Sequence, residues 1–189
     1  AFFKNLFDPY LTVKNDNTRV DLLDITRIAN FFYPDKIKSL LNKKGSSIMK
    51  LESIAHTNGI KNFTAHDAMG DTYASLELAR LIKKQIPELW EKSIMQSSKV
   101  KLEASIPSKP FCYLESFFGK SKLFCLSFVD FHPQYKWALC FDLFEDPKKI
   151  LDMNKSDIYA FLESSPKKIR KIKLNKSPIL LDVEIKKTL

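Results

Sequence analysis

The chain changes character near residue 100, from helical spacing to short aromatic and β-branched runs. Apolar residues recur at helical spacing over 20–32 and 65–84, and a shorter helix is predicted over 49–57 before Asn58-Gly59. Later segments have the composition of strands: CYLESFF, LFCLSFVDF, WALCFDLF, KIRKIKL and PILLDVEI, beginning at residues 112, 123, 137, 168 and 178. This order predicts an α/β protein of two domains. We place the boundary in the linker-like SSKVKLEASIPSKP at 97–110, so that residues 1–98 and 99–189 form the two domains.

The charge of the chain favours a polyanionic partner. It carries 31 Lys and Arg against 22 Asp and Glu, a formal net charge of +9. Almost all of the basic residues are lysine, which binds phosphate as a point charge, so the composition favours contact with a nucleic-acid backbone over base readout. The densest basic stretch is KKIRKIKLNK at 167–176, which contains no acid. We therefore expect a basic surface in the second domain.

Hydropathy and cysteine content favour a cytoplasmic protein. No apolar run approaches the roughly 18 residues that cross a membrane, and no signal peptide is recognisable. The three cysteines, Cys112, Cys125 and Cys140, form no CxxC pair, which predicts reduced thiols and no cysteine metal site. We expect a monomer without a membrane partner.

The segment TAHDAMGDTYAS at 64–75 carries the most suggestive chemistry. In a helix, Asp71 would share an apolar stripe with Ala74 and Leu78, where a bare carboxylate is costly unless it is paired. Mg²⁺ would pair with it, because this ion takes carboxylate and phosphate oxygens together. His66, at the start of the helix, would then deprotonate an attacking water. The H-x4-D spacing also arises by chance, and a histidine there can simply cap the helix, so both interpretations stay open.

Several motifs together resemble the bacterial exodeoxyribonuclease I family. These are FDPY at 7–10, DNTRVDLLDITR at 16–27, LESIAHTNGIKNFTAHDAMGDTYASLELARLI at 51–82 and HPQYKWALCFDL at 132–143. The family contains 3′-to-5′ single-stranded DNA exonucleases of the DEDDh group, with a ribonuclease H-like catalytic domain. SFFGKSKLFCLSFVDFHPQYK and KIRKIKLNKSPIL resemble its SH3-like domain, and only the connector at 35–48 is weakly similar.

The resemblance implies the back half of a ribonuclease H-like domain followed by an SH3-like DNA-binding domain. It also implies Mg²⁺-dependent release of 5′-mononucleotides in DNA repair and recombination, with His66 as general base and Asp71 as a metal ligand. The family's other metal-binding acids come from an Asp-x-Glu strand and a further Asp ahead of FDPY, and residues 1–6 contain neither. Asp21 and Asp24 are interpreted as ordinary helix-start acids. We therefore expect a fragment, also without the family's C-terminal helical region, that is inactive by itself.

The resemblance further implies contacts with single-stranded DNA, and a single-strand-binding protein as a second partner. The matching positions are Tyr10, Arg27, Lys50 (an arginine in the family), Arg170 (a lysine in the family), Ile172 and Asn175. Lys92 stands where the family has a DNA-contacting tyrosine, so a stacking contact of about 1–3 kcal/mol would be lost there. Alternatively, Arg27 lies on a solvated helix face and Tyr10 packs in a loop. Two other functions stay open: a different DEDDh exonuclease, for proofreading or RNA trimming, or a non-catalytic single-strand-binding module.

Overall fold

The first part of the chain is helical. The computed structural model describes residues 17–61, 63–106, 109–117 and 119–184. Its first helices are α2 (Leu22–Phe32), α3 (Leu51–Thr57), α4 (Ala68–Gln85) and α5 (Pro87–Met95). Local chemistry sets the ends, since a side-chain oxygen of Asp21 accepts a hydrogen bond from the backbone N–H of Leu23 at 2.9 Å at the start of α2. Pro87 ends the regular helix before it and begins α5, a position where its missing N–H costs nothing.

The second part contains a four-stranded antiparallel sheet. Its strands are β1 (Phe111–Phe117), β2 (Lys120–Phe131), β3 (Ala138–Asp142) and β4 (Ile169–Ile172), paired in the order β1-β2-β3-β4. The strand predicted in PILLDVEI is wrong: Leu181 makes an isolated bridge with Cys112, and the backbone of Leu180 is bonded by the side chain of Gln96 instead. The side-chain amide of Gln96 thus takes the place of backbone pairing to a fifth strand.

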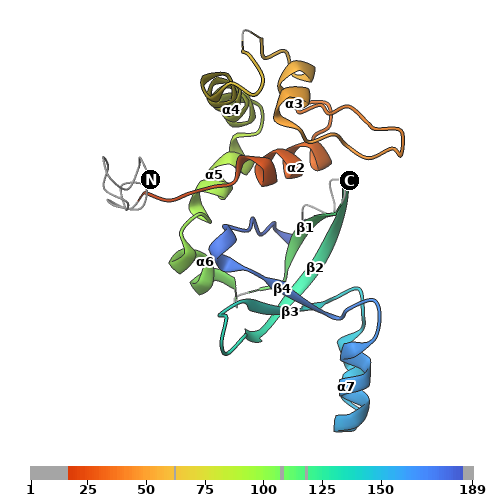
Figure 1. The fold of residues 1–189 in the computed structure, drawn as a ribbon. Helices are drawn as coiled ribbons and strands as arrows, with labels where there is room; N and C mark the ends of the chain where they lie inside the picture. The colour runs from red at the N-terminus through yellow and green to blue at the C-terminus, as the bar shows by residue number, and fades with distance from the viewer. Residues whose placement is uncertain (1–16, 62, 107–108, 118, 185–189) are drawn as a thin grey trace.

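The linker predicted at 97–110 is also wrong. Residues Lys99–Ser105 form helix α6, and Leu102 and Ile106 are buried against the sheet. Helix α6 lies beside the sheet, whereas α7 (Lys155–Glu163) projects away from it and buries no residue (Figure 1). Two short 3-10 turns, Pro147–Ile150 and Leu174–Lys176, complete the described elements.

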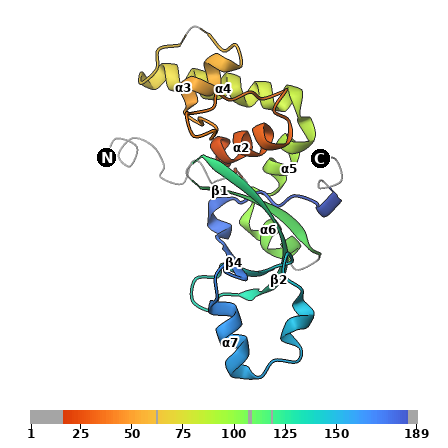
Figure 2. The ribbon, with the colours of Figure 1, turned by 90° about the vertical axis from the view of Figure 1, so that its right-hand side faces the viewer.

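Two hydrophobic clusters meet at β1. The first cluster joins α2–α5 and includes Cys112 and Leu114 from one face of β1. The second lies between α6 and the sheet and includes Phe111, from the other face, with Phe124 and Ile172. Strand β1 therefore contributes to both cores, and α2 and α5 lie close to this edge of the sheet (Figure 2).

The three cysteines lie in strands β1, β2 and β3. None of these described residues forms a disulfide, and Cys112 and Cys140 are buried. Burial raises the pKa of the Cys140 thiol to about 12. Within the described ranges, no helix combines the length and the apolar character needed to cross a bilayer.

Candidate nucleic-acid interface and catalytic residues

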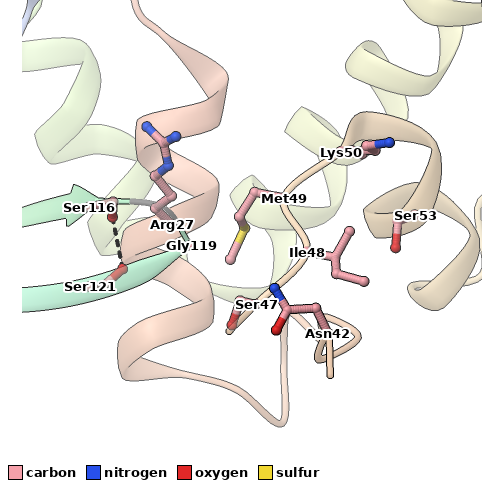
Figure 3. Close-up of a pocket in the computed structure, with 10 residues that line it drawn as sticks. All are labelled: Arg27, Asn42, Ser47, Ile48, Met49, Lys50, Ser53, Ser116, Gly119 and Ser121. Carbon is pink, nitrogen blue, oxygen red and sulfur yellow. Dashed lines mark hydrogen bonds between the residues drawn. The ribbon is translucent and has the colours of Figure 1, made fainter. Parts of the chain in front are cut away.

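A hollow with a mixed polar and apolar lining lies between the helical part and the β1–β2 hairpin. Its volume is about 660 Å³, and it brings together Arg27 of α2 and Lys50 at the start of α3, two predicted DNA contacts (Figure 3). Ser116 and Ser121 of the hairpin lie on the same side as Arg27, across the hollow from Lys50 and Ser53 (Figure 3). We call this space the Arg27–Lys50 hollow. Both parts of the fold are needed to form it.

Side-chain amides hold the connector that forms one wall of the hollow. Asn30 of α2 donates to the carbonyl of Ile37 at 2.9 Å and accepts hydrogen bonds from the hydroxyls of Ser39 and Ser47. Asn42 accepts hydrogen bonds from two backbone N–H groups of the same turn, at 2.8 and 3.0 Å. The connector is thus fixed on α2 by hydrogen bonds as well as by burial of Ile37 in the helical cluster.

The hairpin tip lies against this connector at Gly119. Its φ of +79° is in the left-handed region, and an added Cβ would lie 3.1 Å from both the Cβ of Ser46 and the carbonyl oxygen of Ser47. Glycine therefore permits the close approach that closes the hollow.

The lining of the hollow offers cations and hydroxyls. The guanidinium of Arg27 is one-third exposed and forms an ion pair with Asp24 at 2.8 Å, and Lys50 is exposed. The hydroxyls of Ser116 and Ser121 lie 2.8 Å apart across the hairpin. The buried hydroxyl of Ser53 has no hydrogen-bond partner among the described residues. Such a lining suits an oxyanion such as a phosphodiester.

Arg170 lies next to this hollow but is already engaged. Its Nη1 lies 3.3 Å from an oxygen of Glu115, and its Cζ lies 3.9 Å from the centre of the Phe124 ring. Glu115 lines a smaller hollow of about 270 Å³ together with Arg27 and Asp24. Burial raises the pKa of Glu115, an effect that Arg170 opposes and Asp142 reinforces. The guanidinium of Arg170 is therefore already paired with an acid, unlike a free cation.

Other predicted contacts lie in different settings. Ile172 is 1% exposed as a whole residue, within the core of the sheet, so it offers almost no surface to a ligand. Asn175 is exposed on the turn after β4, and Lys92 is ion-paired with Asp182 on a different face. Tyr10 lies outside the described residues.

Some of the charges in the basic run at 167–176 are paired with acids and are not free at the surface. Lys168 is 6% exposed and donates to Glu145 at 2.6 Å, and Lys167 pairs with Glu163 at 2.8 Å. Lys171 and Lys173 are exposed. The basic surface expected from this run is thus smaller than its sequence predicts.

His66 lies where the sequence places it, at the start of α4. It is exposed, in the turn before the N-cap residue Asp67, with a φ of 64°. Asp67 accepts a hydrogen bond from the N–H of Gly70 at 2.9 Å, so it caps the helix. The histidine is therefore not the cap, and its ring is available for other chemistry.

Asp71 is less buried than its helical spacing predicts. The buried residues of α4 are Gly70, Ala74, Leu78 and Ile82, whereas Asp71, in the first turn, is half-buried. The spacing itself holds, because seven residues bring Leu78 to within about 20° of the direction of Asp71. Within the described ranges, no group of three or more His, Cys, Asp or Glu could hold a metal ion.

Sequence reasoning missed the residues that shape the hollow. The Gly119-Lys120 break separates two strand-like runs, but the packing partner of Gly119 is distant in sequence. Asn30 carries no local signal, because its partners lie in the weakly similar connector, whereas Asn42 bonds only within its own turn.

Known exonucleases are similar to this chain in sequence and in fold. Exodeoxyribonuclease I of Buchnera aphidicola subsp. Acyrthosiphon pisum is 30% identical over 97% of this chain and 47% of the relative. Escherichia coli exonuclease I in complex with a dT13 oligonucleotide matches 97% of this chain and 43% of its own, with 27% identity and a TM-score of 0.75. An ExoI/SSB-Ct complex matches 97% of this chain and 42% of its own, at 27% identity and a TM-score of 0.73. The chain spans less than half the length of these proteins, and no family model matches it.

The matched proteins are exonucleases, hydrolases that act on DNA, and this is the class to which the fold corresponds. Within that class, the chain matches part of exodeoxyribonuclease I, the family that its motifs resemble. The mixed helix and sheet architecture is likewise confirmed.

Proposed function

We propose that this chain is part of a 3′-to-5′ exonuclease that degrades single-stranded DNA to 5′-mononucleotides in DNA repair. The observation that supports this most directly is the meeting of Arg27 and Lys50 in one hollow lined by hydroxyls. A related protein with the same fold is in complex with a dT13 oligonucleotide. We further propose that residues 1–98 belong to a ribonuclease H-like domain and residues 99–189 to an SH3-like domain.

The hollow has the chemistry to hold a strand by its backbone. Arg27 and Lys50 would neutralise phosphates, and the hydroxyls of Ser116 and Ser121 would donate to phosphate oxygens. Base edges find few matching groups there, because the remaining lining includes Ile48 and Met49. Binding would therefore depend little on sequence.

His66 and Asp71 are proposed as general base and metal ligand. Asp71 offers a half-buried carboxylate, the oxygen ligand that Mg²⁺ prefers, whereas the carboxylate of Asp67 is occupied by the helix cap. In such sites a bound metal ion stabilises the attacking and leaving oxygens. The neutral imidazole of His66 would take a proton from water, and its exposed position before α4 leaves the ring accessible.

Oligonucleotide binding tests the role of the hollow. We expect the double variant Arg27→Ala/Lys50→Ala to weaken oligo(dT) binding at least tenfold and to reduce the slope of log K against log salt by about 1.4, since each neutralised phosphate contributes about 0.7. The matched control is Arg80→Ala/Lys84→Ala, which removes the same two residue types from the exposed face of α4. Equal losses in both double variants would contradict a specific site.

Catalysis requires a separate test. The 189-residue chain alone is expected to bind DNA without digesting it. We would join to it the segment of the E. coli relative that precedes the matched region, and add Mg²⁺. His66→Ala should then lower the rate by about 100- to 10,000-fold, the usual contribution of a general base. His56→Ala, also an exposed histidine, is the control. A chimera whose activity ignores His66 would refute the assigned role.

Partner and setting follow from the same proposal. Because a protein of the same fold occurs in an ExoI/SSB-Ct complex, we propose a single-strand-binding protein as a second partner. The free cysteines fit a reducing cytoplasm, and we propose that the chain acts there as a monomer. Digestion of matched DNA and RNA strands by the chimera would separate this function from that of an RNA-trimming enzyme.

A further inference from the structure

The loop between β2 and β3 carries an ordered group of aromatic rings. The rings of Tyr135 and Trp137 are stacked, with centroids 4.6 Å apart and an interplanar angle of 19°. The ring of His132 lies 4.8 Å from that of Tyr135. Backbone hydrogen bonds from His132 to the carbonyl of Trp137, at 2.8 Å, and from Lys136 to the carbonyl of His132, at 2.9 Å, fix the loop. The rings are thus held in place before any ligand arrives.

Tyr135 faces solvent, whereas Trp137 and His132 are half-buried beside it. Tyr135 is 53% exposed, which is unusual for a large aromatic residue already stacked on a second ring. The neighbour of Trp137, Ala138, is fully buried in the core of the sheet, so alternation along the strand directs Trp137 to the opposite face. Packing within the described part of the chain therefore does not explain why the rings are here.

Positive charge surrounds the rings. The ammonium of Lys173 lies 4.9 Å from the centre of the Trp137 ring, and Lys136 and Lys171 are exposed nearby, on the loop and on β4. Lys171 is paired in register with Leu139, and Leu139 with Asp130, which is the acid closest along the ladder. Glu163 is also near Lys171, which helps to lower the pKa of that carboxyl, so three lysines stand against two acids and the remaining positive charge favours an anionic ligand.

We propose that Tyr135, Trp137 and Lys173 form a stacking platform for single-stranded DNA, with the rings contacting bases and the lysine contacting phosphate. An exposed aromatic face with adjacent cations is how proteins hold single strands without reading sequence. The proposal rests on the proposed function, because the ligand is the same strand. The site itself is new: β2 separates it from the Arg27–Lys50 hollow by roughly 36 Å, at about 3.3 Å for each residue step.

A comparison of two ligands isolates stacking from charge. Oligo(dT) offers bases and phosphates, whereas an abasic oligonucleotide of equal length offers phosphates alone. Tyr135→Ala should weaken oligo(dT) binding by about 5- to 100-fold, the range for loss of one stacked base, and leave abasic binding within about twofold. Tyr135→Phe keeps the ring and should retain affinity. Tyr159→Ala on α7, where the tyrosine is 62% exposed, is the control.

Fluorescence gives a second measurement that needs no loss of a ring. The chain has two tryptophans, so Trp90→Phe leaves Trp137 as the sole reporter. Oligo(dT) should quench its fluorescence and the abasic strand should not. Equal effects of Tyr135→Ala on both ligands, no effect on either, or an unquenched Trp137 would each overturn the platform.

The same titrations keep this proposal distinct from the previous one. If Arg27→Ala/Lys50→Ala leaves oligo(dT) binding intact while Tyr135→Ala weakens it, the platform stands and the hollow fails. The reverse pattern removes the platform and leaves the hollow.

Discussion

Glu115 faces Arg170 at 3.3 Å and also lines the small hollow that contains Arg27. Its carboxylate therefore lies between two of the cations expected to contact a strand. Tyr113, on the same face of β1, has its pKa raised to about 12 by burial and then by Asp24 and Glu115. The acids at this point of the structure thus oppose a bound phosphate.

Removing the charge of Glu115 should strengthen DNA binding. We expect Glu115→Gln to tighten oligo(dT) binding by about threefold to tenfold, because a repulsion across several ångströms at a wet surface is worth about 1 kcal/mol. Glu163→Gln, which neutralises an exposed acid paired with Lys167 on α7, should change affinity by less than about twofold. Binding isotherms at fixed salt measure both. Weaker binding by Glu115→Gln would show that the carboxylate positions Arg170 for DNA.

The raised pKa of Glu115 also gives stability a pH dependence of known sign. Because the folded-state pKa lies above the ordinary value of 4.5, Glu115 contributes stability below pH 4.5 that is lost as pH rises through the folded-state pKa. The pKa values of Asp182, Glu163 and Glu145 are lowered, chiefly by lysine hydrogen bonds, so their contributions are lost only as pH falls. Urea unfolding of wild type and Glu115→Gln should therefore diverge as pH rises above 4.5. Parallel pH profiles would contradict this assignment.

Single residues also show what sequence can and cannot predict. His66 was placed correctly because a helix start has a local signature in Asp67 and the residues after it. The free charge of the 167–176 run was overestimated, because Glu145 and Glu115, which neutralise Lys168 and Arg170, lie on other elements. Pairing across a sheet is invisible in a count of local charges.

At the scale of elements, α4 depends on a close contact at Gly70. A Cβ added there would lie 2.1 Å from the carbonyl oxygen of Thr64, in the segment that leads to His66. The backbone of Thr64 cannot yield as a flexible side chain would. Gly70 thus lets the segment before α4 lie against the helix and sets the position of His66.

Gly70→Ala should therefore destabilise the fold although alanine favours helix. Overpacking costs about 1–3 kcal/mol, which exceeds the roughly 1 kcal/mol gained in helix propensity. Thr72→Ala, at an exposed position two residues later in α4, should change stability by less than about 0.5 kcal/mol. Urea unfolding monitored by circular dichroism measures both changes. A more stable Gly70→Ala variant would mean that Thr64 moves freely.

Elements were predicted well where their periodicity was strong. The helix expected over 65–84 is Ala68–Gln85, and the strand expected over 123–131 lies within Lys120–Phe131. Helix α6 was missed because its seven residues bury little beyond Leu102, and polar neighbours hid that one apolar position. Short elements that are defined by tertiary contacts leave too few residues for a periodic signal.

At the scale of the whole molecule, the two parts share a core. Cys112 and Leu114 from β1 lie in the cluster formed by α2–α5, and Leu181 bonds to Cys112 through backbone hydrogen bonds of 2.7 and 2.8 Å. Ile179 and Leu181, from the C-terminal side of the sheet, belong to the same helical cluster. The helices would therefore expose apolar surface if the sheet unfolded. The sequence could not predict this shared core, because it shows only one change from helix-like to strand-like segments, near residue 100, and that change suggests two separate domains.

This shared core predicts that the chain unfolds as one cooperative unit. Trp90 lies against the helical cluster and Trp137 borders the sheet, so Trp137→Phe and Trp90→Phe leave one reporter in each part. The two reporters should give the same urea midpoint, as expected for a two-state domain. Leu114→Ala should lower both midpoints together, by about 2–5 kcal/mol in unfolding free energy, whereas Leu151→Ala, at a residue 81% exposed, should lower neither. Separate midpoints, or a Leu114→Ala effect confined to Trp90, would show two parts that fold independently. In that case one part could bind single-stranded DNA while the other part is unfolded.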